Sequence, residues 1–274
     1  MTSQMIVQFL HPGAEHQPAG PIMDWNVGVH RRKFIQAQGI AVRQSERFNG
    51  LLGFWGEWEA PSSVTPIARP IPEGPRFLHQ PFYKAGVKTP RRQNTDPCVF
   101  GGFRYTCCQQ HYARRPSGMQ TLAPGSLILF GSSREGVFVL DTLMVTKDTG
   151  IEHDRTNYRS LLKDRVPPGY FDVTLEPWYV DPYEPCRLYE GATQSAPFQS
   201  MYSFFPAEPW SDSSNGFRRP AIDLPGIISP NQRQGRKFTV ATPSEAQRVW
   251  NDVVRQVTEA GYWLGVEADF PPRL

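Results

Sequence analysis

The sequence predicts an α+β fold that is rich in β-structure, with a strongly bent sheet or small barrel and few helices. The first observation is a hairpin pattern, in which two apolar runs, Leu127–Phe130 and Val137–Val145, are joined by a segment rich in Gly and Ser. The second is a single strong helical pattern over residues 243–260. The third is the content of 27 prolines and 23 glycines, which exceeds the usual share and favours long irregular connections.

The remaining strands are predicted from short runs of β-branched and aromatic residues bounded by turn residues. We expect extended segments at Met5–Leu10, Leu51–Glu59, Phe77–Tyr83 and Cys98–Cys107, and further ones near 170–176, 186–190, 199–205 and Tyr262–Val266.

The helix at 243–260 has signals at both ends. Thr242-Pro243-Ser244-Glu245 has the spacing of a capping box with Pro at the first helical position, and Gly261 is suited to end the helix. Between them, apolar residues recur at helical spacing: Ala246, Val249, Trp250, Val253, Val254 and Val257. We expect this helix to bury one face. A shorter helix is predicted at 154–165.

Length and composition indicate one compact domain over residues 1–274. The amino terminus lacks the features of a signal peptide, and no apolar run is long enough to cross a membrane. The four cysteines, Cys98, Cys107, Cys108 and Cys186, have neither disulfide-framework nor CxxC spacing. We therefore expect a cytoplasmic protein with reduced thiols and no membrane partner. The sequence leaves the oligomeric state open.

The net charge of +3 is unevenly distributed. Residues 1–120 hold 14 Lys/Arg and 7 Asp/Glu, whereas residues 121–274 hold 15 and 19. The excess in the first half predicts an anionic partner, most often nucleic acid, with DNA favoured over RNA; the alternative is that these are solvated basic loops. Three clusters would bind phosphates: His30-Arg31-Arg32-Lys33, Arg91-Arg92 and Arg114-Arg115. The second half would be mainly scaffold.

Two segments between these clusters could form a site. In Phe54–Glu59, Trp55 could stack on a base beside the carboxylate of Glu57; alternatively, Phe54 and Trp58 lie in the core and Trp55 covers its rim. In the segment before Cys98, the amides of Gln93 and Asn94 could hydrogen-bond a base edge, and Asp96 could activate water. The alternative for this segment is a turn in which Asn94 and Asp96 bond to the backbone.

Several common enzyme motifs are missing from the sequence: GxGxxG, GxxxxGK[ST], HExxH, GxSxG and CxxC. The usual nucleotide-cofactor, ATPase, zinc-protease and serine-hydrolase interpretations therefore lose their strongest support. The histidines are scattered, so the sequence predicts no metal site. Asp141 interrupts an apolar strand, and we expect it to be partly buried with a structural role.

Leu122–Phe130, with Pro124-Gly125 ahead of a hydrophobic strand, and the following strand Val137–Val145 resemble part of a PUA-like domain of the ASCH or EVE type. The resemblance covers residues 122–145. It implies a small barrel that binds RNA, or DNA with a modified or flipped base, and it assigns no catalytic residue.

Together these features predict a protein that recognises a flipped, modified base in DNA. As an enzyme it would excise the base without metal or cofactor, as a DNA glycosylase does, with Asp96 and Glu57 as catalytic carboxylates. Trp55, Gln93 and Asn94 would bind the base. One alternative is a non-enzymatic reader of modified DNA or RNA. A second is a carbohydrate or nucleotide hydrolase with paired carboxylates.

Overall fold

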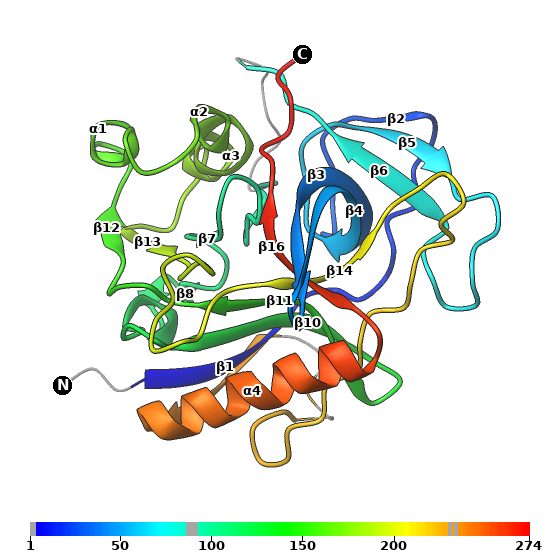
Figure 1. Cartoon of the computed structure of the whole chain (residues 1–274). Helices are drawn as coiled ribbons and strands as arrows, with labels where there is room; N and C mark the ends of the chain where they lie inside the picture. Colours follow the sequence, from blue (N-terminus) through cyan, green and yellow to red (C-terminus); the bar gives the residue numbers. More distant parts are fainter. Residues whose placement is uncertain (1–3, 86–92, 230–231, 233–234) are drawn as a thin grey trace.

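The computed structural model describes residues 4–85, 93–229, 232 and 235–274, and it has the β-rich α+β architecture expected from the sequence (Figure 1). A larger sheet contains seven strands: β2 (Ile22–Met23), β3 (Lys33–Arg43), β4 (Glu46–Gly56), β5 (Ser62–Pro66), β6 (Phe77–Pro81), β14 (Phe205–Pro209) and β16 (Trp263–Ala268). Their order is β16-β14-β4-β3-β6-β5-β2, and β16 also pairs with β3. Strands β3, β4, β14 and β16 therefore close into a ring, which bends the sheet strongly.

A second sheet has the order β11-β10-β1-β15, from β1 (Gln4–Leu10), β10 (Leu127–Arg134), β11 (Val137–Val145) and β15 (Gly235–Ala241). The predicted hairpin is confirmed as β10–β11, and its two-residue turn, Glu135-Gly136, has positive φ at both positions. The predicted amino-terminal strand is confirmed as β1, which lies parallel to β10 and antiparallel to β15. Whether the hairpin belongs to a PUA-like domain stays a prediction.

Short elements complete the fold. Strands β12 (Ile151–His153), β13 (Cys186–Glu190) and β7 (Arg104–Tyr105) form a three-stranded sheet, and β8 (His111–Tyr112) pairs with β9 (Arg115–Pro116) ahead of the 3-10 turn η1 (Gly118–Gln120). The helical elements are α1 (Tyr158–Leu162), α2 (Pro168–Tyr170), η2 (Phe171–Leu175), α3 (Glu176–Tyr179) and α4 (Pro243–Glu259).

The predicted carboxy-terminal helix is confirmed as α4. Its capping box is formed, because Thr242 Oγ1 accepts a hydrogen bond from the Glu245 N–H and the Glu245 carboxylate accepts one from the Thr242 N–H. Trp250 and Val253 are among the side chains that α4 buries against the four-stranded sheet, which lies above it in Figure 1. The following strand, predicted at Tyr262–Val266, is confirmed as β16.

Three strand predictions need correction, and one long strand was missed. Of the strand expected at Cys98–Cys107, only the two-residue β7 forms, with isolated bridges at Cys98 and Phe100. Residues 170–176 are helical, because Pro168 suits the first helical position and Tyr170 and Val173 are buried on one face of a continuous helical segment. The strand predicted near 199–205 begins only at Phe205. The strand β3 was missed, since its charged start and its Gln and Gly residues hide the apolar alternation.

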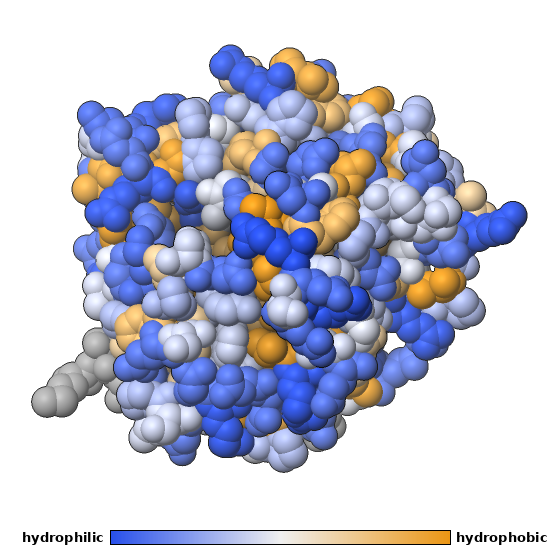
Figure 2. All heavy atoms as spheres, in the orientation of Figure 1, coloured by the Kyte–Doolittle hydropathy of each residue, from blue (hydrophilic) through white to orange (hydrophobic). Residues whose placement is uncertain are grey.

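Strand β1 divides the core between its two faces. Val7 and Phe9 point into the largest apolar cluster, which also contains side chains of β3, β4, β10 and the helical segment 168–175. Ile6 and Leu10 point the other way, into the cluster under α4. The outer surface seen in Figure 2 is mostly hydrophilic, with small and separate hydrophobic patches. Among the described residues, no helix combines the length and apolar character needed to cross a membrane.

Candidate functional site

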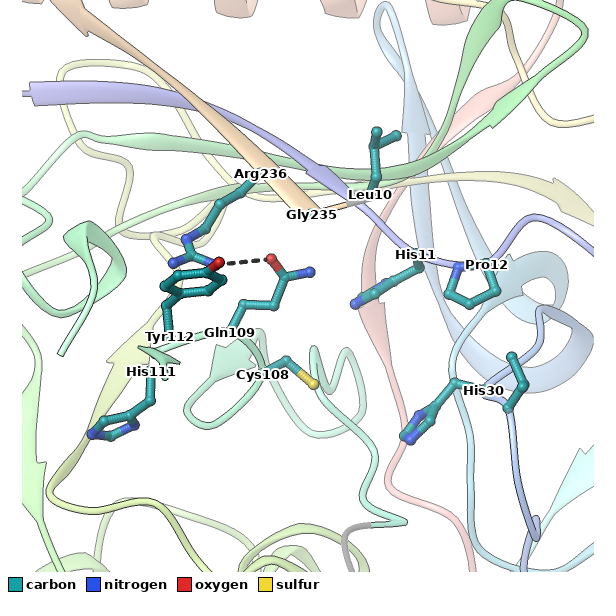
Figure 3. Close-up of a pocket in the computed structure, with 11 residues that line it drawn as sticks. Leu10, His11, Pro12, His30, Cys108, Gln109, His111, Tyr112, Gly235 and Arg236 are labelled. Atoms are coloured by element: carbon teal, nitrogen blue, oxygen red, sulfur yellow. Dashed lines mark hydrogen bonds between the residues drawn. The ribbon is translucent and has the colours of Figure 1, made fainter. Parts of the chain in front are cut away.

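A pocket of about 850 Å³ opens where the carboxy-terminal end of β1 meets the start of β15 (Figure 3). His11 follows β1 directly and lines one side together with His30. The opposite side is formed by Cys108, Gln109, His111, Tyr112 and Arg236. All four cysteine thiols of the chain are free, and that of Cys108 points into this space. The pocket lining, in full, is Leu10, His11, Pro12, Val29, His30, Cys108, Gln109, His111, Tyr112, Gly235 and Arg236.

Six buried charged side chains lie behind the two histidines. The pairs are Arg32 Nη2 with Glu57 Oε2 at 2.7 Å, Lys33 Nζ with Glu59 Oε1 at 3.2 Å, and Arg219 Nη1 with Asp141 Oδ1 at 3.4 Å. A further contact of 3.8 Å between Arg32 Nη1 and Asp141 Oδ2 joins the first pair to the third. We call these six residues the charge network. Three formal positive and three formal negative charges balance, as burial of ions requires.

The β3–β4 hairpin explains why these charges meet. Strand β3 begins at Lys33, which pairs in register with Gly56 at the end of β4, so residues 30–33 and 57–59 lie side by side. Asn26 then fixes Glu59, donating to its Oε2 at 2.5 Å, and Thr95 Oγ1 accepts the Glu59 N–H at 3.0 Å. The register of one long hairpin thus brings the cations and the carboxylates together.

Glu57 is shared between the two histidines of the pocket. His30 Nδ1 lies 3.2 Å from Oε1, and His11 Nδ1 lies 3.4 Å from Oε2. Arg32 Nη1 also lies 3.2 Å from His11 Nδ1. A guanidinium can only donate, so Nδ1 of a neutral His11 accepts this hydrogen bond and Nε2 carries the hydrogen. Within the described part of the chain, that buried Nε2 has no hydrogen-bond partner.

The environment separates the protonation states of the two histidines. Burial lowers the pKa of His11 to about 3, outweighing the opposite effect of Glu57. Burial also lowers the pKa of His30, but the hydrogen bond to Glu57 and the charges of Glu59 and Glu57 outweigh it, so this pKa lies above its ordinary value. At neutral pH the site thus holds a neutral imidazole beside one that is biased toward its charged form, and such a separation is typical of acid–base sites.

His30, Glu57 and Glu59 could in principle hold a metal ion, since their ligand atoms lie within 4.8 Å of one another. The two carboxylates, however, already contact Arg32 and Lys33, and Lys33 approaches the same Glu59 oxygen that faces His30. A divalent cation would have to compete with two buried cations. The donor set therefore fits a metal poorly.

The position of Asp96 argues against the catalytic role expected from the sequence. Its carboxylate is fully buried and accepts three backbone N–H bonds, from Thr106, Cys107 and Cys108, at 2.6–2.9 Å. Burial raises its pKa to about 7, although the three N–H groups act in the opposite direction. Asp96 therefore shapes the turn that carries Cys108 to the pocket, and it does not face a substrate.

The three residues expected to bind a base, Trp55, Gln93 and Asn94, also lie away from the pocket. Trp55 is 3% exposed, donates its indole N–H to the carbonyl of Phe217, and has one ring face covered by Arg219 at 5.2 Å. Asn94 is buried, and the amide of Gln93 bonds to Asn26 and to the carbonyl of Gly28. None of the three lines this pocket, and Trp55 instead lines a second one together with Arg31.

The basic clusters separate in the fold. Arg32 and Lys33 are buried as partners of Glu57 and Glu59, so their expected phosphate-binding role is wrong. Arg31 is exposed and lines a different pocket. Arg114 and Arg115 are exposed on the β8–β9 hairpin beside Tyr112 at the pocket mouth. Arg91 and Arg92 lie outside the described residues.

Sequence reasoning identified Glu57 and His30 but missed His11, Tyr112 and Arg236. His11 had a usable signal, because it comes directly after a buried strand, where loop residues often line sites. The third pair of the charge network had none, since Asp141 and Arg219 lie 78 positions apart in the sequence. No protein-family model, curated protein or solved structure matches the chain.

Replacing Asp96 by Asn tests its structural role. An amide NH₂ in place of either carboxylate oxygen leaves at least one buried backbone N–H without an acceptor, so we expect the free energy of unfolding to fall by about 1–3 kcal/mol. Urea denaturation measures this, with Asp212→Asn, an exposed aspartate, as the control. Unchanged stability of Asp96→Asn would show that the three hydrogen bonds are not structural.

Replacing Glu59 by Gln tests the charge network. Lys33 is fully buried and loses its counter-charge, so we expect a loss of about 3–5 kcal/mol in the free energy of unfolding. The double variant Lys33→Met/Glu59→Gln should recover part of it, because no unpaired ion remains. Glu259→Gln, which breaks an exposed pair with Arg255, should cost less than about 1 kcal/mol. Equal losses of unfolding free energy in Glu59→Gln and Glu259→Gln would contradict a stabilising role for the charge network.

Proposed function

We propose that this protein acts on nucleic acid, DNA in particular, and that it accepts an extruded, modified base into the pocket and excises it. The observation that supports this most is the pair of histidines on the two oxygens of Glu57, with opposite pKa shifts, at the edge of the pocket. The pocket volume of about 850 Å³ is within the range of small-molecule sites and leaves room for a base with its sugar.

In the proposed reaction, His30 is the general acid. As the bond between the sugar C1′ and the base nitrogen breaks, its electron pair leaves with the base and takes a proton from His30. Water then attacks C1′ and gives its proton to the neutral His30, which restores the imidazolium.

Glu57 acts through His30 in this mechanism. Its two oxygens already accept hydrogen bonds from His30 and Arg32, so it is a positioning residue and not the group that activates water. The carboxylates of Glu57 and Glu59 are both held by buried cations, which weakens the alternative of a carbohydrate hydrolase with paired free carboxylates.

Three arginines support an anionic polymer as the substrate. Arg236 lines the pocket, and Arg114 and Arg115 are exposed on the hairpin at its mouth. Arginine side chains at such a position suit phosphate oxygens on either side of an extruded nucleotide.

His30→Gln tests the reaction. The variant keeps a polar side chain but has no proton to give, so release of the free base should fall by at least about 100-fold. Duplexes with modified and unmodified bases would be incubated with the protein, and released base measured by mass spectrometry. His16→Gln, a histidine that does not line this pocket, is the matched control and should behave as wild type.

The pH dependence gives a second readout of the same proposal. Release should be retained below the pKa of His30 and fall as pH rises through it, and Glu57→Gln should move this fall to lower pH. Full activity of His30→Gln would overturn the assignment. Salt-sensitive binding with no released base would indicate a non-enzymatic reader, and no binding to DNA or RNA at low salt would refute both.

A further inference from the structure

The β8–β9 hairpin is a short, well-defined projection at the pocket mouth. Tyr112 pairs with Arg115 across it, and the two turn residues, Ala113 and Arg114, have φ values of 47° and 65°. Positive φ at both central positions is the type I′ geometry, whose twist matches that of the flanking strands. The turn is therefore tight although neither residue is glycine.

The base of the hairpin is firmly held. The Ser117 N–H donates to the carbonyl of Gln110 at 2.8 Å, and Ser117 Oγ donates to the carbonyl of Gln109 at 2.8 Å. The side chain of Gln110 in turn makes two bonds to the backbone of Arg187, at 2.6 and 2.7 Å. These bonds tie the hairpin to β13, so the tip projects from a fixed support.

The tip carries an aromatic ring with positive charge beside it. Tyr112 is 76% exposed, yet it also lines the pocket, and its neighbours Arg114 and Arg115 are exposed. Val29 lines the same pocket and is 64% exposed. A large ring left in water at a pocket mouth, on a rigid support and next to two arginines, indicates a partner that offers both stacking surfaces and anions.

We propose that Tyr112 is a wedge that enters double-stranded DNA and stacks in the space left by the base extruded into the pocket, while Arg114 and Arg115 contact the flanking phosphates. This inference rests on the proposed function and specifies its substrate as duplex. An extruded base leaves a gap whose neighbours have lost stacking partners, and an inserted side chain replaces that contact. A single strand has no such gap, so the wedge matters only for duplex.

The test compares duplex and single-stranded substrates of one sequence. Tyr112→Ala should lower base release from duplex by about 10- to 100-fold, in line with the loss of one stacking contact, and leave release from single strands within about 2-fold of wild type. Tyr112→Trp should retain duplex activity. Val240→Ala, which shortens an apolar side chain that is 67% exposed and does not line the pocket, is the control.

A duplex with 2-aminopurine opposite the wedge position reports unstacking directly. Wild type should raise its fluorescence on binding and Tyr112→Ala should not, while Arg114→Gly/Arg115→Ala should weaken binding and lower its salt dependence. Equal losses of release from duplex and single strands in Tyr112→Ala would overturn the wedge and leave the proposed function standing. Absence of both binding and release in wild type would overturn the proposed function itself.

Discussion

The ion pair between Arg32 and Glu57 is the interaction on which the candidate site depends. Both side chains are about 1% exposed, and removing either partner would leave an unpaired ion in the core. Arg32 also contacts Asp141 and the Nδ1 of His11, so one guanidinium organises the carboxylate, the tautomer of a pocket histidine and the link to Arg219. Its position follows from the β3–β4 hairpin, whose end register sets residues 30–33 against residues 57–59.

A buried network of this size is costly compared with apolar packing of the same volume, and apolar substitutes for buried ion pairs are often neutral or stabilising. Since the network lies beside the pocket, we infer that the fold retains it for its effect on the protonation states of His11 and His30. The network keeps Glu57 ionised, because the charge of Arg32, together with the hydrogen bond from His30, opposes the effect of burial on the pKa of Glu57. An ionised Glu57 in turn favours the protonated form of His30.

The sequence predicted the parts of the fold that local pattern determines. The hairpin at Leu127–Val145 and the capped helix α4 were found because their periodicities and end residues are strong. The strand β3 was missed because Lys33 and the polar residues after it look like a basic surface cluster. Its burial depends on Glu59, and no local pattern shows that a lysine has a carboxylate partner 26 residues away.

The site predictions succeeded or failed for the same reason, because the sequence does not show which partners a polar or aromatic residue meets in the fold. Glu57 was identified from its aromatic neighbours and His30 as part of a basic cluster expected to bind phosphate, and the structure brings the two together at the pocket. Asp96 and Trp55 were equally strong candidates from the sequence. In the structure, however, three backbone N–H groups bond to the Asp96 carboxylate, and Arg219 covers one face of the Trp55 ring. No sequence pattern identified Tyr112 as a site residue, because its exposure depends on the turn at Ala113-Arg114.

The most direct measurement of the central claim is an NMR titration of the imidazole nitrogens of His11 and His30. We expect His11 to keep the signals of a neutral Nε2–H tautomer from pH 5 to pH 8, while His30 titrates above its ordinary pKa of 6.5. We also expect Glu57→Gln to lower the pKa of His30. Two histidines that titrate together near 6.5, unaffected by Glu57→Gln, would contradict the account.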